Sequence, residues 1–345
     1  MTSASGTAND LDPVTIRPFA PGDEQAVLAC HNAVFADAAR GAAPRSLAHW
    51  RWKFVANPTA RVQQMLAVHP QQGVVGVYGS LPVAITCGGR RAFATQAVDH
   101  CVRPAWLRHG GEHGLFSRLG QAFLDRWLGT GPEQSLLVYG LPGSGWRSGA
   151  RNLGWQIARD WDLTFRDLTP DDRPRAMPAA LEVHAVARFG VDTDELFARL
   201  EPDFGVATVR DQRYLNWRYA DHPERRYVLF ECRERPSGRL RGVCVYGVGD
   251  LLRPHTSYVV DWLQATNDHD TMTALLAAAE GRAQQDGTGL LCSVWNHMDP
   301  RFLAIQEHGY RVRGTSWFLA IASALYDLVF FRDRWYFTLG DSDLV

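Results

Sequence analysis

The order of hydrophobic and polar positions predicts an alternation of short strands and helices. Apolar runs or alternating apolar and polar residues predict strands at residues 14–18, 64–68, 74–78, 92–102 and 136–139. Helices are expected at residues 24–35 and 115–128, and a last helix should end near Gly154. One buried helix face is formed by residues that recur every four positions, Leu115, Leu119, Phe123 and Trp127. Strands with helices on their faces indicate an α/β or α+β fold.

The strongest organisational signal is an internal repeat. Trp52-Lys53-Phe54-Val55-Ala56-Asn57-Pro58 matches Trp217-Arg218-Tyr219-Ala220-Asp221-His222-Pro223, with aromatic, cationic, polar and proline positions in the same order. Four further pairs of segments follow in the same order: residues 16–24 with 186–195, 76–79 with 243–247, 97–99 with 259–261, and 153–155 with 308–310. A separation of about 155 to 170 residues is too long for a solenoid repeat and indicates a duplicated domain.

The repeat divides the chain into two halves. Residues 1–13 are small and polar and are expected to be a disordered lead-in. The first half is predicted to span residues 14–165 and the second half residues 181–345. Between them, residues 166–180 combine charges with Pro170, Pro174 and Pro178, a composition that suits a linker.

Composition narrows the class of protein. The 345 residues are 46 % apolar and 21 % charged, with a net charge of -1, so no bulk field attracts nucleic acid or an anionic membrane. No apolar run reaches the roughly 18 residues that span a bilayer. The six cysteines are scattered and the histidines lack metal-ligand spacing, so we expect reduced thiols in a cytoplasmic protein, with no disulfide framework and no metal.

One glycine-rich loop carries the chemistry. Residues 103–114 connect a predicted strand to a predicted helix and contain Gly110, Gly111 and Gly114. Unpaired backbone N–H groups and about half a positive charge make such a helix N-terminus an anion site. A Walker loop requires a lysine after its glycines, and this loop has none. A dinucleotide-binding fold requires G-x-G-x-x-G directly after the strand, and that pattern is also missing here. The loop therefore predicts a diphosphate site of another kind.

This loop resembles the cofactor signature of the GNAT acetyltransferases. Val102-Arg103-Pro104 matches the strand end, and Gly111-Glu112-His113-Gly114-Leu115-Phe116 matches the turn into the helix, although Gly111 stands where an arginine or glutamine is usual. The resemblance implies tandem domains, each a mixed, mostly antiparallel sheet flanked by helices, and acetyl-CoA or another acyl-CoA as cofactor. It assigns cofactor binding to the end of the strand and to the loop that enters the helix: Cys101, Val102, Arg108, His109, Gly110, Gly111, Glu112, His113, Gly114, Leu115 and Phe116.

The second half lacks these features. Its equivalent loop, residues 264–271, has no glycine. Asp268 and Asp270 are expected at the helix N-terminus as caps, where they satisfy the groups that a diphosphate needs and repel it. We interpret this half as a degenerate copy. The layout resembles tandem acetyltransferases of the enhanced-intracellular-survival type and the mycothiol synthases.

Candidate catalytic groups lie beside the loop. Asp99 and His100 precede the cofactor strand end, where this superfamily often places an acid, and Glu112 is a further neighbour. Asp261 repeats Asp99 in the degenerate half, which favours a structural role for both. The family's usual tyrosine acid is replaced by Ala150. Some tandem members bring the C-terminal carboxylate into the site, so the carboxylate of Val345 is a further candidate base.

Three functions remain open at this stage. The first is an N-acetyltransferase acting on the amine of a small molecule or sugar precursor. The second is a Fem-like aminoacyl or acyl transferase of cell-envelope or polysaccharide biosynthesis, although the chain has no basic patch for tRNA. The third is a non-catalytic acyl-CoA-binding module. The expected partners are a small amine acceptor and no nucleic acid, with a monomer or a homodimer both possible.

Overall fold

The computed structural model describes residues 14–38, 44–107, 114–143 and 153–344. The elements of the first half are β1 (Thr15–Pro18), α1 (Glu24–Ala38), α2 (Leu47–Trp50), the π-helical turn η1 (Arg51–Val55), β2 (Met65–His69), β3 (Gly73–Tyr78), β4 (Ser80–Cys87), β5 (Arg90–Ala97), β6 (Cys101–Val102), α3 (Pro104–Leu107), α4 (Leu115–Trp127), β7 (Leu137–Gly140) and β8 (Gln156–Asp167).

The second half repeats this order. Its elements are β9 (Leu181–Val186), α6 (Asp192–Leu200), η3 (Glu201–Asp203), β10 (Val206–Thr208), α7 (Gln212–Leu215), the π-helical turn η4 (Asn216–Ala220), β11 (Val228–Glu234), β12 (Leu240–Gly249), β13 (Thr256–Gln264), α8 (His269–Gln285), β14 (Leu290–Ser293), α9 (Pro300–Glu307), β15 (Arg311–Ser323), α10 (Leu328–Arg334), β16 (Trp335–Tyr336) and η5 (Leu339–Asp341).

The strands form two sheets. The smaller has the order β1-β2-β3-β6, and the larger has twelve strands in the order β16-β10-β4-β5-β7-β15-β8-β14-β13-β12-β11-β9. Neighbours are antiparallel except for the pairs β5–β7, β13–β14 and β10–β16. The predicted mixed, mostly antiparallel sheet with flanking helices is confirmed.

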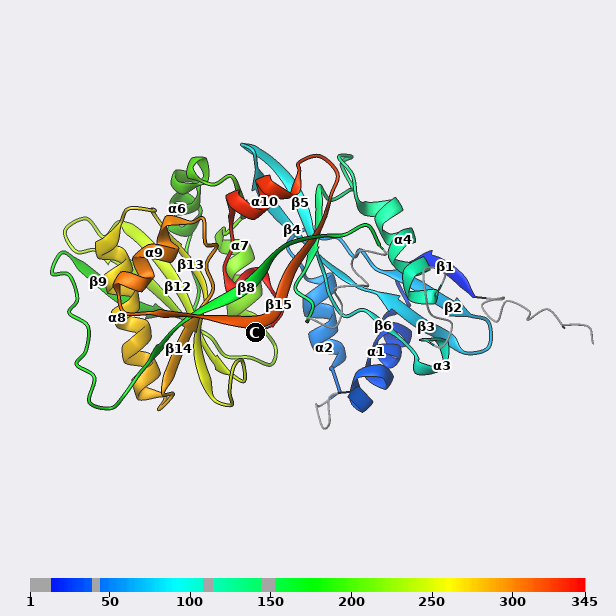
Figure 1. The fold of residues 1–345 in the computed structure, drawn as a ribbon, viewed down its shortest axis with the longest axis horizontal. Helices are drawn as coiled ribbons and strands as arrows, with labels where there is room; N and C mark the ends of the chain where they lie inside the picture. Colours follow the sequence, from blue (N-terminus) through cyan, green and yellow to red (C-terminus); the bar gives the residue numbers. More distant parts are fainter. Residues whose placement is uncertain (1–13, 39–43, 108–113, 144–152, 345) are drawn as a thin grey trace, which may run out of the picture.

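Two long strands join the halves. β8 pairs with β14 of the second half, and β15 pairs with β7 of the first half. The two strands also pair with each other, and Figure 1 shows them running side by side across the middle of the molecule. β8 continues past residue 165 to Asp167, so the sheet is continuous where the sequence suggests a boundary. The division at residues 165 and 181 stays a prediction.

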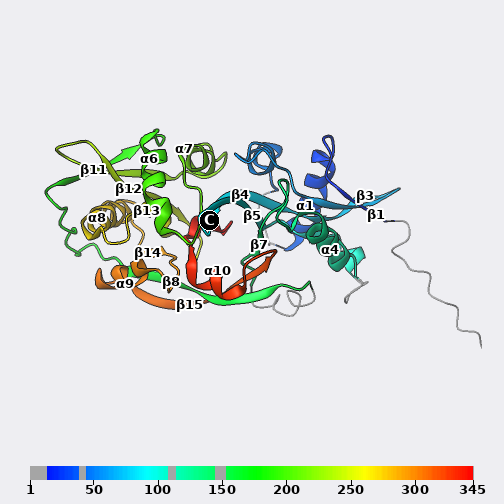
Figure 2. The same ribbon diagram turned by 90° about the horizontal axis from the view of Figure 1, so that it is seen from above.

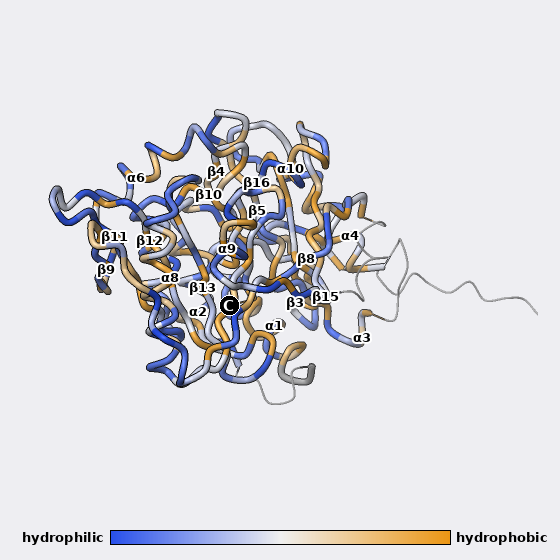
Figure 3. Tube along the Cα trace, turned by 60° about the vertical axis from the view of Figure 1, so that its left-hand side comes forward, coloured by the Kyte–Doolittle hydropathy of each residue, from blue (hydrophilic) through white to orange (hydrophobic). Residues whose placement is uncertain are grey.

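The main helices cover the sheets with one apolar face. α4 packs on β2 and β3, and its predicted face of Leu115, Leu119, Phe123 and Trp127 is buried. α8 packs on β9, β11 and β12 in the second half. Figure 2 shows α8 and α4 toward opposite ends of the molecule, and in Figure 3 hydrophobic and hydrophilic residues alternate along the helices and strands. None of the helices in the described part of the chain has the length and apolar character that a membrane crossing needs.

The predicted strand at residues 92–102 needs a correction. The structure breaks it into β5 and β6, with residues 98–100 between them. Asp99 takes a φ of 55°, which interrupts the extended backbone. Val98 N–H donates to the carbonyl of Gly79 at 3.1 Å, and a Cβ on Gly79 would lie 2.6 Å from the carbonyl oxygen of Val98. The apolar residues on both sides of Asp99 hid this break. The sequence also predicts a last helix of the first half that ends near Gly154. Residues 144–152, where most of this helix would lie, are outside the described residues.

Candidate active site

The site begins where two parallel strands part. β5 and β7 pair from Ala94 with Leu137 as far as Gln96 with Tyr139. Beyond that point the chain turns at residues 98–100, and β6 pairs with β3 in the smaller sheet. The two strands therefore diverge, and the backbone on either side of the opening lacks the partner that a continuous sheet would supply.

A cavity of about 460 Å³ occupies the opening. It is lined by Phe35, Ala97, Val98, Asp99, His100, Phe116, Gly140, Leu141, Pro142, Trp155 and Asp343. Three residues named from the sequence, Asp99, His100 and Phe116, are thus brought to one cavity. Its walls are mostly apolar, with a few polar groups, which is the usual character of a small-molecule site.

Asp99 is a tightly paired carboxylate. It accepts two hydrogen bonds from the guanidinium of Arg45, and its Oδ2 lies 3.1 Å from the Lys53 ammonium. Burial raises the pKa of Asp99, but Lys53, His31 and Arg45 outweigh burial and hold the pKa well below its ordinary value. These contacts favour an electrostatic role for Asp99 over that of a base.

His100 is a neutral imidazole at the wall of the cavity. Its Nε2 lies 2.9 Å from the carbonyl oxygen of Gly79, which can only accept, so Nε2 carries the proton and Nδ1 is the atom that can take another. The ring stacks on Tyr78 at 3.7 Å between centroids. Burial lowers the pKa of His100 to about 4, which keeps the ring uncharged at neutral pH.

The predicted cofactor residues are only partly described. Cys101 and Val102 form β6, are buried, and pair with Val77 and Gly76 of β3. Gly114 is the N-cap of α4, followed by the buried Leu115 and by Phe116. The remaining candidates lie outside the described residues: Arg108, His109, Gly110, Gly111, Glu112, His113 and, for catalysis, Val345. Their assignment stays a prediction.

The two repeats differ at the helix that follows the opening. The N-cap of α4 is Gly114, which has no side chain. The N-cap of α8 is Asp268, whose carboxylate accepts from Thr271 N–H at 3.1 Å and lies 2.8 Å from Arg241. Asp268 is therefore a cap, as predicted, whereas Asp270 lies inside the first turn. The N-cap of α4 therefore carries no carboxylate, whereas the N-cap of α8 carries one that would repel an anion.

The equivalent opening in the second half is filled by the chain itself. β13 and β14 pair only at Ser257 with Leu291 and Tyr258 with Cys292. Residues 335–342, the C-terminal segment, then contact the remainder of β13. The Tyr336 hydroxyl donates to the Trp262 carbonyl at 2.6 Å, and Thr338 donates to Asp261 at 3.0 Å. The C-terminal segment therefore lies against the part of β13 that does not pair with β14.

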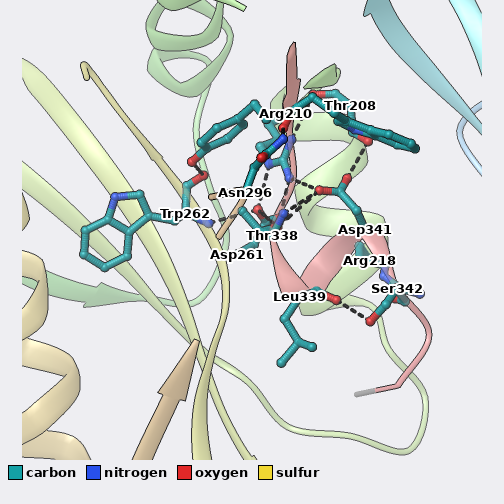
Figure 4. A network of polar contacts seen from close by, with 12 residues as sticks. Thr208, Arg210, Arg218, Asp261, Trp262, Asn296, Thr338, Leu339, Asp341 and Ser342 are labelled. Atoms are coloured by element: carbon teal, nitrogen blue, oxygen red, sulfur yellow. Dashed lines mark hydrogen bonds and ion pairs between the residues drawn. The ribbon is translucent and has the colours of Figure 1, made fainter. Parts of the chain in front are cut away.

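Figure 4 shows the polar network that holds the C-terminal segment. Arg210 lies 2.7 Å from Asp261 and 2.6 Å from Asp341, and all three side chains are almost fully buried. Thr208 donates to Asp341 at 2.6 Å. Arg218, which repeats Lys53, donates to the carbonyl of Ser342 at 2.5 Å. Buried charges that are paired in this way fix one arrangement of the segment.

A larger basin of about 870 Å³ lies in the second half, beside the N-terminus of α8. Its lining includes Arg199, Arg239, Arg241, Asp203, Asp268 and Asp270, so cations and carboxylates are balanced. It lies at the rim of the sheet, and the opening between β13 and β14 is filled. We therefore place the reactive site in the smaller cavity of the first half, because that cavity lies in the open gap between strands.

Two residues of the site, Arg45 and Asp343, were not predicted from the sequence. Arg45 binds Asp99 as Arg210 binds Asp261, and each arginine precedes its repeated tryptophan, Trp52 or Trp217, by seven positions. Extending the repeat upstream would have found Arg45. Asp343 lines the cavity, with Oδ2 3.1 Å from Lys53 Nζ. Its only sequence signal is an acid in the tail, two residues before Val345.

No family model and no curated protein matches the sequence. Solved structures do match. A tandem GNAT protein from the clavulanic acid biosynthesis pathway has a TM-score of 0.57 and 15 % identity, over 91 % of this chain and 99 % of that one. A GCN5-related N-acetyltransferase from Anabaena variabilis has a TM-score of 0.63 and 12 % identity, over 89 % and 72 % of the chains. The chain has the tandem GNAT fold. N-myristoyltransferase of Saccharomyces cerevisiae, in a structure with bound myristoyl-CoA, aligns with this tandem GNAT fold at a TM-score of 0.56 and 11 % identity, over 90 % and 82 % of the chains.

Within the tandem GNAT fold, metal ligands and thiols can be checked directly among the described side chains. In residues 14–38, 44–107, 114–143 and 153–344, no group of three or more His, Cys, Asp or Glu side chains is placed to hold a metal ion. All six cysteines are buried free thiols. The candidate active site is therefore the cavity in the open gap of the first half. His100 and Phe116, in the first turn of α4, both line this cavity.

Proposed function

We propose that the protein is an acyl-CoA-dependent N-acyltransferase whose first half holds the acyl-CoA. In this proposal acetyl is the transferred group, the acceptor is the amine of a small molecule or sugar precursor, and the protein acts in the cytoplasm. The observation that carries the proposal is the difference between two equivalent openings. The first is an open cavity beside a helix whose N-cap is Gly114, and the second is filled by residues 335–342.

The residues that would hold acyl-CoA follow from this geometry. β6 is bonded to β3 on one side and is the last strand of the smaller sheet, so the backbone of Cys101 and Val102 can pair with an amide-containing arm. The N-terminus of α4 at Gly114 suits a diphosphate, and the predicted loop of residues 108–113 would complete its binding. When bound, acyl-CoA supplies an activated thioester.

His100 is the proposed proton carrier. Nδ1 takes a proton from the acceptor nitrogen as the new C–N bond forms, and the C–S bond of the thioester breaks. Because burial lowers the pKa of His100 to about 4, the protonated ring is more acidic than an ordinary imidazolium and can return that proton to the leaving sulfur. No tyrosine is among the described residues that line the cavity, so a single proton carrier accounts for the absence of the family's usual acid at Ala150.

Asp99 supports this chemistry without exchanging protons. Its carboxylate is held by Arg45 and Lys53, and its left-handed backbone ends β5 and directs His100 toward the cavity. The proposed role of Asp99 is therefore to shape the turn at residues 98–100. Both residues were named from the sequence as candidate catalytic groups. The proposal keeps a catalytic role for His100 and gives Asp99 a structural one.

The test is the release of CoA thiol from acetyl-CoA and from longer acyl-CoAs, with a panel of small amines, by wild type and His100→Asn. The proposal expects amine-dependent turnover, with kcat lowered about 10²- to 10⁴-fold in the variant and acyl-CoA affinity unchanged. Acyl-CoA binding without turnover for any amine would favour a non-catalytic binding module. Turnover only with aminoacyl-tRNA would favour a Fem-like transferase.

A further inference from the structure

Asp343 reaches the cavity from the far end of the chain. It follows η5 and lines the cavity together with Phe35, Leu141, Pro142 and Trp155, all of which come from the first half. Its side chain is 35 % exposed, whereas that of Asp99 is 11 % exposed. Asp343 is therefore the carboxylate that a molecule entering the cavity meets.

The position of Asp343 is fixed from both sides. Two residues upstream, Asp341 is held by Arg210 and Thr208 in the buried network of Figure 4. On the cavity side, Lys53 Nζ lies 3.1 Å from Asp343 Oδ2 and 3.1 Å from Asp99 Oδ2. Lys53 is the only lysine of the chain, and its side chain is 5 % exposed. Its compact ammonium ion bridges two carboxylates, and the other oxygen of Asp343, Oδ1, accepts a long hydrogen bond of 3.4 Å from Gln96 Nε2.

The described wall of the cavity contains acids but no basic side chain other than the neutral His100. Asp99 and Asp343 line it, and no arginine or lysine is among the described lining residues. Arg45 and Lys53 lie behind the wall and are engaged with Asp99. Among the described lining residues, an anionic group in this cavity would face the carboxylates of Asp99 and Asp343 and no cation, while a cation would gain an ion pair with Asp343.

We propose that Asp343 determines acceptor specificity, and that the acceptor is a cationic amine with an apolar or aromatic body and no acidic group beside the nitrogen. This inference rests on the proposed N-acyltransferase function and names its substrate class. The ammonium ion binds Asp343, and the body packs against Phe35, Leu141 and Trp155. Before attack the nitrogen gives its extra proton to solvent, and the proton released on bond formation passes to His100 Nδ1.

The proposed class of acceptors excludes amines that carry an acidic group near the nitrogen. Amino acids carry a carboxylate one carbon from the amine, and phosphorylated sugars carry a dianion. Both would place negative charge against Asp343 or Asp99. An arylalkylamine has the same apolar body as the corresponding amino acid without the acid, so a matched pair of compounds isolates this single difference.

The experiment measures binding and turnover of 2-phenylethylamine and L-phenylalanine by the full chain in the presence of saturating acetyl-CoA. The variants are Asp343→Asn and, as a matched control, Asp333→Asn, whose carboxylate pairs with Arg332 on α10 outside the cavity. Binding is read as the Kd fitted to the rise in unfolding temperature with the concentration of each compound, and turnover as CoA release.

For wild type and Asp333→Asn, 2-phenylethylamine is expected to bind at least about tenfold more tightly than L-phenylalanine. Asp343→Asn should bind 2-phenylethylamine about 10- to 100-fold more weakly than wild type does. The ratio of its affinities for 2-phenylethylamine and L-phenylalanine should approach one, and its affinity for acetyl-CoA should not change. Equal or tighter binding of phenylalanine by wild type, a preference that persists in Asp343→Asn, or no binding of either compound would overturn the inference. Absence of turnover despite the expected binding would instead count against the proposed function.

Discussion

The indole nitrogen of Trp52 donates to the carbonyl of Trp217 at 2.8 Å, and the indole nitrogen of Trp217 donates to the carbonyl of Trp52 at 2.9 Å. The two rings stack at 5.3 Å between centroids with an interplanar angle of 22°. Such a reciprocal exchange is what a two-fold axis produces between identical subunits. The residues that reveal the repeat in the sequence thus form the contact between its two copies, and the chain has the internal symmetry of a dimer.

The tryptophan pair should be energetically coupled. Trp52→Phe and Trp217→Phe each remove one buried N–H donor and leave one carbonyl without it, at a cost of about 1 to 3 kcal/mol in the free energy of unfolding. Because the rings touch, we expect the double variant to depart from additivity by about 0.5 kcal/mol or more in denaturant unfolding. Trp106→Phe, which loses a bond to Gln72 within the first half, is the control and should be additive with Trp52→Phe. Additive losses in the Trp52 and Trp217 pair would contradict a coupled contact.

The C-terminal segment should affect the first-half site from a distance. Thr208→Val removes the 2.6 Å hydrogen bond to Asp341, and is expected to cost about 1 to 2 kcal/mol of stability. Because Asp343 follows Asp341 by two residues, affinity for the amine should fall severalfold while acyl-CoA affinity is unchanged. Both affinities are measured by titration calorimetry.

Thr164→Val provides the matched control for that experiment. Its buried hydroxyl bonds to Ser293 between β8 and β14, away from the C-terminal segment. The control should lose comparable stability and keep amine affinity. If Thr208→Val keeps full amine affinity, or if Thr164→Val loses as much, then docking of the segment does not set the position of Asp343.

Stability should depend on pH through His100. Its pKa is about 4 in the folded protein and near 6.5 when unfolded, so the unfolded state binds more protons between these values. The contribution is fully present above about pH 6.5 and is lost as pH falls toward 4, by up to roughly 3 kcal/mol. Burial also lowers the pKa of His222, so this histidine likewise makes the protein less stable as the pH falls.

The matching measurement compares the free energy of unfolding at pH 7 and pH 5 for wild type and His100→Asn. The loss between the two pH values should be smaller in the variant, because the variant lacks one of the groups that take up a proton on unfolding. An equal loss in both proteins would show that His100 titrates normally in the folded state, and would remove the basis for a neutral imidazole of low pKa at the cavity.

Local periodicity predicted most of the elements around the site. The every-fourth-residue pattern of α4 and the apolar runs of β2, β3 and β7 were found from the sequence because each element buries one face or both. The predicted tandem GNAT fold is confirmed by the solved structures. These features depend on residues close to one another in the chain.

Features that depend on distant residues were not predictable in this way. The break at Asp99 lies inside an apolar run and depends on Arg45 and Lys53, both more than forty positions away. The pairing of β8 with β15 joins segments about 150 residues apart, and the entry of Asp343 depends on the docking of residues 335–342. No local pattern encodes such contacts, because their energy appears only when the two halves meet.

Binding of acyl-CoA at the first half alone is the central claim, and thermal unfolding with and without acetyl-CoA tests it most directly. The proteins are wild type, Gly114→Asp and Asp268→Asn. Gly114→Asp places a carboxylate at the N-cap of α4, and Asp268→Asn removes the charge at the N-cap of α8 while keeping a capping side chain. A hundredfold excess over Kd stabilises by about 2.7 kcal/mol. The account predicts this stabilisation in wild type and Asp268→Asn and its loss in Gly114→Asp. Stabilisation that persists in Gly114→Asp would contradict it.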